Sequence, residues 1–238
     1  MESKIYYPRV DQLSKEEYAL LRKKTIGASD VASLFGVAFK KTLQELIAEK
    51  ANPELTEEEK SIGDLPSVRK GNDLEPLILK KFIDLAGEDA IKPQDMYLIS
   101  PGLTVNYDAI TAIGRPVELK YVTTFGHKNW NTTEKGIIKK PEFISNKHDM
   151  EAYVRDMANY YGVPPYYYTQ LQTQMYGLRA KEGYLCALFE KDWELRIYVI
   201  PQDEILWRNI PVRAMLAHRE AFPDLYEETP DSTCNRDY

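Results

Sequence analysis

Two apolar segments joined by a short turn constrain this sequence more than any other feature. Residues 103–110 and 117–122 are rich in Val, Leu, Ile and Tyr, and Ile113-Gly114-Arg115-Pro116 separates them. Glycine and proline together are typical of a turn, so the pattern predicts two β-strands that pair as a hairpin. Pairing of these strands would bring their charged side chains together.

The charged residues of this hairpin predict a metal site. Asp108 lies near the end of the first segment, and the second segment holds Glu118-Leu119-Lys120. Side chains alternate along a strand, so Glu118 and Lys120 share one face, and Asn106 and Asp108 share one face. Converging carboxylates suit Mg²⁺, and a lysine beside them can orient or deprotonate a water. These groups are the equipment of a metal-dependent phosphodiester hydrolase.

A simpler interpretation of the same residues stays open at this point. With 29% charged residues in the chain, such spacing also arises by chance, and Glu118 and Lys120 would then mark the solvated face of an edge strand. A third carboxylate, Glu75, favours the metal site. It lies on the border of the apolar stripe of an amphipathic helix, where it is either a boundary residue or a metal ligand.

Two further groups of residues predict phosphate binding. Gln170 and Gln174 lie one helical turn apart while Gln172 faces away from Gln170, and glutamines position a phosphate or a water rather than transfer protons. Arg22 precedes a break at Gly27-Ala28-Ser29, where the N-terminus of a helix would offer free N–H groups to an anion. The alternatives are solvent-facing glutamines, a capping serine and a surface arginine.

Composition limits the class of protein. The chain has 238 residues and is 43% hydrophobic, which is enough for one domain with a core over about residues 15–221. No apolar run is long enough to span a bilayer, no signal-peptide pattern opens the chain, and Cys186 and Cys234 are too few for a disulfide framework. We therefore expect an intracellular protein. A net charge of −6 argues against binding nucleic acid by charge alone, but not against an enzyme that binds it locally.

The order of helical and strand patterns predicts an α/β fold, in which helices flank a central mixed sheet. Residues 123–148 are expected to be a long loop or insertion, residues 51–66 a loop and residues 223–238 a polar tail. The expected helices are 14–24, 31–35, 42–50, 71–85 (regular only some residues after Gly71, because of Pro76), 148–161, 168–178 and 203–221, and the expected strands are 96–100, 103–110, 117–122, 184–189 and 195–200.

The order of the motifs resembles that of the YqaJ-like viral recombinase nucleases, the phage lambda exonuclease family of the PD-(D/E)XK superfamily. The resemblance covers roughly residues 15–200 and implies a restriction-endonuclease-like core. Tyr107 departs from the proline of the superfamily name, Ala109 from a common glycine and Asn106 from a serine. The motifs are Arg22, Ile26-Gly27-Ala28-Ser29-Asp30, Gly71-x-x-x-Glu75, Asp108, Glu118-Leu119-Lys120 and Gln170-Leu171-Gln172.

The resemblance also implies a role for each matched residue. Asp108 and Glu118 would bind Mg²⁺, with Mn²⁺ as a substitute, and the backbone carbonyl of Leu119 would be a further ligand. Lys120 would activate or orient the attacking water, and Glu75 would support the second of two ions. A DNA phosphate, in the exonucleases the 5′-terminal one, would be held by Arg22, Ser29 and Gln170, with Gln172 as a second candidate on the same helix and Asn106 at the position of the serine.

The implied activity is that of a DNA exonuclease. It would degrade one strand of linear double-stranded DNA from the 5′ end, release 5′-phosphomonoesters and expose 3′ single strands for recombination by annealing. The expected partners are double-stranded DNA, a single-strand annealing protein and further copies of the chain in a trimeric ring, in the cytoplasm of a bacterium or of an infected host cell. The alternatives are an endonuclease or Cas4-like end-processing nuclease, and a non-catalytic nucleic-acid-binding module on the same fold.

Overall fold

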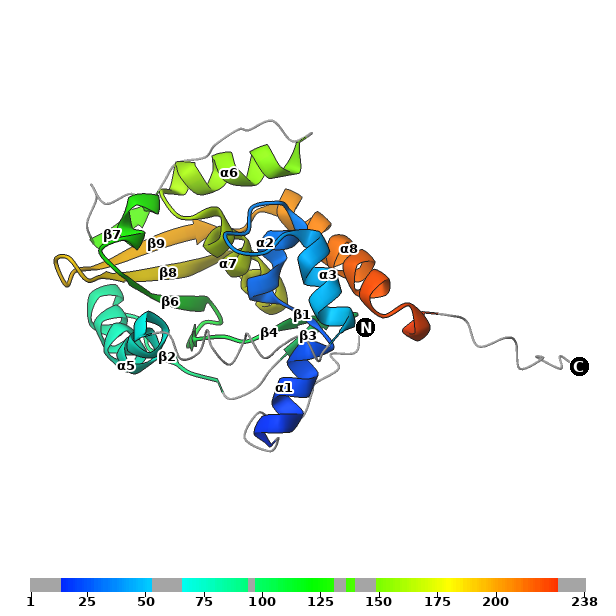
Figure 1. Ribbon diagram of the computed structural model, residues 1–238. Helices are drawn as coiled ribbons and strands as arrows, with labels where there is room; N and C mark the ends of the chain where they lie inside the picture. The colour runs from blue at the N-terminus through cyan, green and yellow to red at the C-terminus, as the bar shows by residue number, and fades with distance from the viewer. Residues whose placement is uncertain (1–13, 53–65, 94–96, 131–135, 140–148, 227–238) are drawn as a thin grey trace, which may run out of the picture.

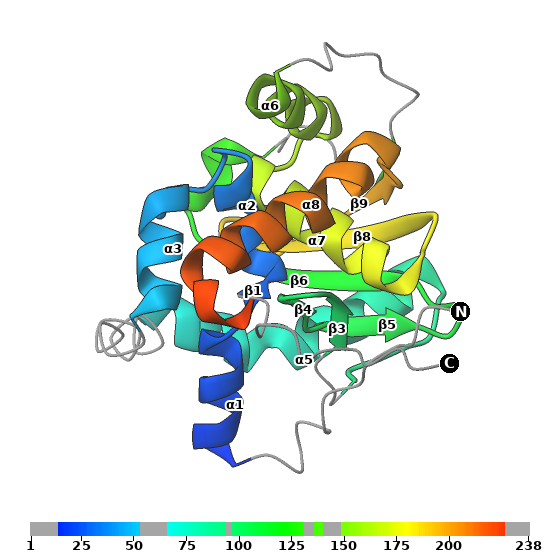
Figure 2. The same cartoon turned by 90° about the vertical axis from the view of Figure 1, so that its right-hand side faces the viewer.

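Helices cover both faces of a central mixed β-sheet (Figures 1 and 2). The computed structural model describes residues 14–52, 66–93, 97–130, 136–139 and 149–226. This layered arrangement is the one that the sequence predicts. No helix among these residues combines the length and the apolar character that crossing a membrane requires.

The central sheet has the strand order β2-β5-β6-β8-β9-β7 within the described residues. The β5–β6 hairpin is antiparallel, as predicted, whereas β6 runs parallel to β8. Because β6 has a neighbour on each side, the alternative of an edge strand is wrong for the strand that carries Glu118 and Lys120. The strands are β2 (Ala90–Ile91), β5 (Ala109–Thr111), β6 (Pro116–Val122), β7 (Gly136–Lys139), β8 (Glu182–Phe189) and β9 (Leu195–Pro201).

The predicted strand 103–110 is in fact two strands in two sheets. β4 (Leu103–Val105) pairs with β1 (Ile26–Gly27) and β3 (Tyr97–Ser100) in a small second sheet, whereas β5 belongs to the central one. Tyr107, in the connection, packs edge-on against Tyr97 and donates from its hydroxyl to the carbonyl of Gln174 at 3.3 Å. These contacts turn the chain out of the pleat, so strand alternation does not place Asn106 and Asp108 on one face.

The helices begin where the sequence supplies caps. Ser14 and Thr42 open α1 and α3 with capping boxes that involve Glu17 and Glu45. Asp149 and Asp203 cap α6 and α8 by accepting backbone N–H groups. The helices are α1 (Lys15–Lys23), η2 (Ala28–Asp30), α2 (Val31–Leu34), α3 (Leu43–Ala51), α5 (Pro66–Ala86), η4 (Gly126–Asn129), α6 (Met150–Tyr161), α7 (Pro165–Leu178), α8 (Glu204–Ala221) and η5 (Pro223–Leu225).

Helix α5 is longer than predicted. It begins at Pro66 rather than after Gly71, and it holds Pro76 in its interior. An interior proline costs about 3 kcal/mol, because a hydrogen bond is lost and the ring crowds the preceding turn. Ile78 and Phe82 of the same helix are fully buried against the sheet, and each contributes roughly 1.5–3 kcal/mol, which offsets that cost.

Part of the predicted loop 123–148 is regular structure. Residues 126–129 form η4, and β7 pairs in parallel with β9 at the edge of the central sheet. The rest of that segment, together with most of the predicted loop 51–66 and of the predicted tail, lies outside the described residues.

Alternation along β6 divides the interior into two layers. Val117 and Leu119 point to one face, where they pack with Ile78 of α5. Glu118 and Lys120 point to the other face, where α7 lies, and Glu118 contacts that helix directly. The sequence alternation thus determines that the charged pair faces a helix rather than solvent.

Gly102, in the turn between β3 and β4, tests how closely α8 packs against this turn. Its φ is +70°, and an added Cβ would lie 2.3 Å from Cγ of His218 on α8. Gly114 is a matched control, because its φ is +81° but nothing lies within 4 Å of its added Cβ. Both alanine variants bear a backbone strain of roughly 1–2 kcal/mol. We expect Gly102→Ala to lower the melting temperature clearly more than Gly114→Ala, and equal shifts would contradict the close approach of α8.

Candidate active site

The three charged residues predicted from the hairpin come together at one point. Glu118 is fully buried and forms an ion pair with Nζ of Lys120. The same Nζ lies 4.0 Å from Oδ2 of Asp108. Asp108 directly precedes β5, and its Oδ2 accepts the backbone N–H of Leu119 at 2.9 Å. The convergence predicted from the sequence is therefore present, while the catalytic roles of these residues stay predictions.

Helix α7 supplies the remaining partners of the buried carboxylate. Nε2 of Gln170 donates to Oε1 of Glu118, and Nε2 of Gln174 donates to Oε2, each at 2.5 Å. The Gln174 amide also donates to the carbonyl of Asn106 at 3.1 Å. The spacing of one turn placed Gln170 and Gln174 on one helix face as glutamines that position a phosphate or a water, and in the structure both amides contact the Glu118 carboxylate.

The pKa values of Glu118 and Lys120 are both raised, for different physical reasons. Burial, and then the negative charge of Asp108, raises the pKa of Glu118 to about 7. Burial alone would lower the pKa of Lys120, but attraction by Glu118 and Asp108 outweighs burial, and the net result is a raised pKa. The ring of Tyr167, 5.1 Å from Nζ, faces the same ammonium. Lys120 is therefore charged at neutral pH, which favours orienting a water over deprotonating it.

The predicted phosphate-binding residues surround a small cavity. The cavity has a volume of about 70 Å³, equal to roughly two water molecules' share of the liquid. A space of this size suits a small anionic group. The residues lining it are Arg22, Gly27, Ala28, Ser29, Asp30, Lys50, Thr104, Asn106 and Gln170.

A larger cleft adjoins this phosphate pocket. It has a volume of about 1130 Å³ and is lined by Lys120, Leu119 and Glu75, among others. Ser29 and Gln170 line both spaces, so the pocket opens beside the charged centre.

Glu75 faces the cleft but stands apart from the other carboxylates. It forms an ion pair with Nζ of Lys92 at 2.7 Å. Over the described ranges, no three side chains of Asp, Glu, His or Cys lie close enough together to hold a metal ion. The support that Glu75 would give to a second ion thus stays a prediction.

The predicted phosphate contact of Gln172 is wrong. Gln172 is fully buried and lies on the opposite side of α7 from Gln170. Its Nε2 donates to the carbonyl of Pro201 at 2.8 Å, and its Oε1 accepts from Asp203 N and Trp207 Nε1, each at 3.0 Å. Its role is to fix α7 against α8.

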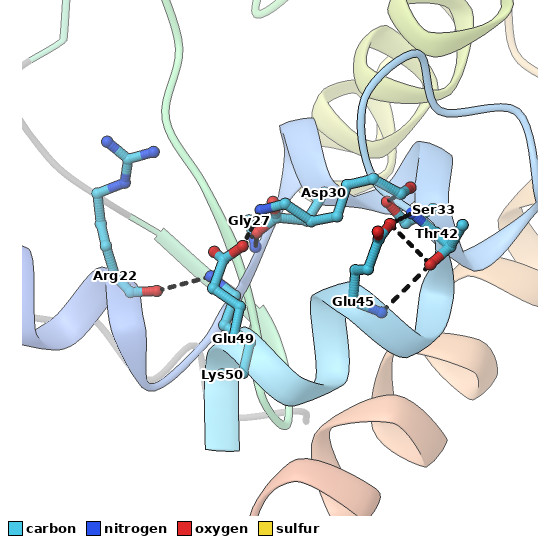
Figure 3. A network of polar contacts seen from close by, with 9 residues as sticks. Arg22, Gly27, Asp30, Ser33, Thr42, Glu45, Glu49 and Lys50 are labelled. Atoms are coloured by element: carbon cyan, nitrogen blue, oxygen red, sulfur yellow. Dashed lines mark hydrogen bonds and ion pairs between the residues drawn. The ribbon is translucent and has the colours of Figure 1, made fainter. Parts of the chain in front are cut away.

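The structure adds an ion pair between the buried Lys50 and the partly buried Asp30, which the sequence did not indicate (Figure 3). Nζ of Lys50 lies 3.1 Å from Oδ2 of Asp30 and donates to the carbonyl of Arg22 at 3.1 Å. Asp30 does not cap α2 through its side chain; its Oδ2 instead accepts the N–H of Gly27 at 3.0 Å. A lysine at the end of a helix is usually solvated, so the sequence pattern carries no signal for this pair.

Comparison with known proteins places the chain in a family. The sequence matches the YqaJ-like viral recombinase domain over residues 17–177, which is more than half of the chain. The protein belongs to the YqaJ-like viral recombinase family. No curated protein sequence matches it.

Solved structures similar to this YqaJ-like protein establish its fold. The alkaline exonuclease LHK-Exo from Laribacter hongkongensis matches with a TM-score of 0.56 and 17% identity, over 89% of this chain and 95% of that one. LHK-Exo in complex with dAMP matches with a TM-score of 0.54 at the same identity and coverage. The predicted restriction-endonuclease-like core is thereby confirmed.

The raised pKa of Glu118 predicts how stability depends on pH. The folded state binds the carboxyl proton of Glu118 more tightly than the unfolded state does. The contribution of Glu118 to the free energy of unfolding therefore falls as pH rises from about 4.5 through about 7. We expect the melting temperature of the wild type in EDTA to fall across this range relative to that of Glu118→Gln, which lacks the ionisation. Parallel curves for the two proteins would contradict the raised pKa.

Proposed function

We propose that this protein is a metal-dependent DNA exonuclease that removes nucleotides from the 5′ end of linear double-stranded DNA. Its products would be 5′-phosphomonoesters and 3′ single strands used in recombination by strand annealing. The convergence of Asp108, Glu118 and Lys120 beside a phosphate-sized pocket carries the proposal. Membership of a viral recombinase family and a fold shared with an alkaline exonuclease, seen also in complex with dAMP, support it.

The residues present fit a magnesium ion. Asp108 and Glu118 offer carboxylate oxygens beside Lys120, and the carbonyl of Leu119, which lines the larger cleft together with Lys120, could add a third oxygen. Oε1 of Gln174 is buried and accepts no hydrogen bond from the described residues, which leaves an acceptor for a water. Bound Mg²⁺, or Mn²⁺ in its place, would neutralise phosphate charge and lower the pKa of a coordinated water. A second ion would require Glu75 to exchange its partner Lys92.

The chain's own residues would hold the reacting groups in place. Lys120, as an ammonium, would orient the attacking water and offset the negative charge that develops on the phosphate. Gln170 and Gln174 would restrain the Glu118 carboxylate by hydrogen-bonding both of its oxygens. These contacts exist before substrate binds, so little reorganisation would be required during the reaction.

Recognition of a 5′ end would use the phosphate pocket. Arg22, Ser29, Asn106 and Gln170 would surround a terminal phosphate, while the next phosphodiester would lie in the cleft near Lys120. An arginine and a hydroxyl are suited to a doubly charged phosphomonoester. This arrangement would direct cleavage to the first nucleotide and so set a 5′→3′ direction.

Assembly and partners are part of the same proposal. A trimeric ring around DNA would keep the enzyme attached to its substrate, and basic residues facing the channel would make the net charge of −6 compatible with DNA binding. A single-strand annealing protein would receive the exposed 3′ strand. The site of action would be the cytoplasm of a bacterium or of an infected host cell.

Digestion of a linear duplex and of a covalently closed circle of the same sequence tests this function. With Mg²⁺ we expect end-labelled linear DNA to be shortened from its 5′ ends while the circle stays intact. Lys120→Ala should lower the rate by roughly 10²–10⁴, the range for one positioned catalytic group, with circular dichroism to check that the variant is folded. Degradation of the circle at a comparable rate would favour an endonuclease, and full activity of folded Lys120→Ala would remove Lys120 from the mechanism.

A further inference from the structure

A buried lysine forms part of the wall of the phosphate pocket. Lys50, in the last turn of α3, is only 7% exposed, and it lines the same cavity as Arg22 and Ser29. Transfer of an ammonium into the protein interior is strongly unfavourable unless its donors find partners. In Figure 3, Lys50 points from α3 toward Asp30 on one side and the backbone of Arg22 on the other.

Lys50 connects the two segments that form the pocket. Its Nζ donates to the carbonyl of Arg22, at the end of α1, and pairs with Oδ2 of Asp30, which ends η2. An ammonium has three N–H donors, and the described residues accept two of them at Lys50. One donor is therefore available to an oxygen in the cavity.

The charges of the pocket depend on this lysine. Arg22 and Lys50 are positive and Asp30 is negative, so the three side chains leave one positive charge in excess. Without Lys50 the excess would vanish, and Asp30 would face the cavity as an unpaired carboxylate. A terminal phosphate would then lose this attraction and face the Asp30 carboxylate, whereas a terminal hydroxyl would be little affected.

We propose that Lys50 is a phosphate-binding residue that makes the pocket selective for 5′-phosphorylated ends, and that Asp30 competes with the phosphate for its ammonium. The inference rests on the proposed function, because it needs the pocket to receive a DNA end. The inference predicts opposite effects on affinity for the two residues of the ion pair. Loss of Lys50 weakens binding of a phosphorylated end, and neutralisation of Asp30 strengthens it. A lysine that only supports the fold would give no such pair of effects.

Binding without hydrolysis tests the proposal. The affinity of the full chain for a duplex with a 5′-phosphate is compared with that for the same duplex with a 5′-hydroxyl, by fluorescence anisotropy in EDTA. We expect Lys50→Met to reduce the preference for the phosphate roughly tenfold or more, as for loss of one charge-assisted hydrogen bond. Lys50→Arg should retain most of the preference, and Asp30→Asn should increase it.

The matched control is Lys70→Met. Lys70 is also ion-paired, with Glu190 at 2.9 Å, but it is exposed and does not line the pocket. Its loss should leave the preference for phosphorylated ends unchanged. Thermal denaturation of every variant checks that the fold is intact.

The outcomes separate this inference from the proposed function. A wild type without any preference for the 5′-phosphate would remove end recognition and the role of Lys50 together. A wild type with the preference, and a folded Lys50→Met with the same preference, would overturn only the inference. If Lys50→Met does not fold, Asp30→Asn decides, and an unchanged or weaker preference for the phosphate in that variant overturns the inference.

Discussion

Burial of the Glu118 carboxylate is the constraint on which the rest of this structure depends. The side chain is fully buried on an interior strand, where an unpaired charge is strongly unfavourable. Lys120, Gln170 and Gln174 all direct donors to it. Strand β6 must therefore lie between β5 and β8, and α7 must lie over its charged face. The contacts of Lys120, Gln170 and Gln174 with Glu118 also fix the positions of the groups proposed to act on a phosphodiester.

Helix α7 supplies partners to Glu118 from one side and is anchored to α8 by the other side. One side presents Gln170 and Gln174 to the charged centre, and the other inserts Gln172 against the start of α8. Asp203 extends that second contact, since its carboxylate accepts hydrogen bonds from the hydroxyls of Tyr153 at 3.1 Å and Tyr168 at 2.9 Å. A buried polar network away from the cleft thus holds in register the helix face that contacts Glu118.

Local patterns predicted much of this arrangement. Alternation along residues 117–122 placed Glu118 and Lys120 on one face, because this pattern depends on nearest neighbours in sequence. The division of 103–110 between two sheets depends instead on contacts of Tyr107 with residues far along the chain. The length of α5 depends on burial of Ile78 and Phe82, which a local rule against interior proline does not include. Lys50 was missed for a similar reason, since its counter-ion lies on another helix.

Isothermal titration with Mn²⁺ tests most directly whether the converging charges form a metal centre. The wild type should bind Mn²⁺, Asp108→Asn should bind it much more weakly, and Lys120→Ala should still bind it, because an ammonium is not a metal ligand. This pattern would assign the ion to the carboxylates of β6 and of the residue preceding β5. Absence of binding to the wild type, or equal binding by Asp108→Asn, would contradict a metal-dependent centre at Asp108 and Glu118.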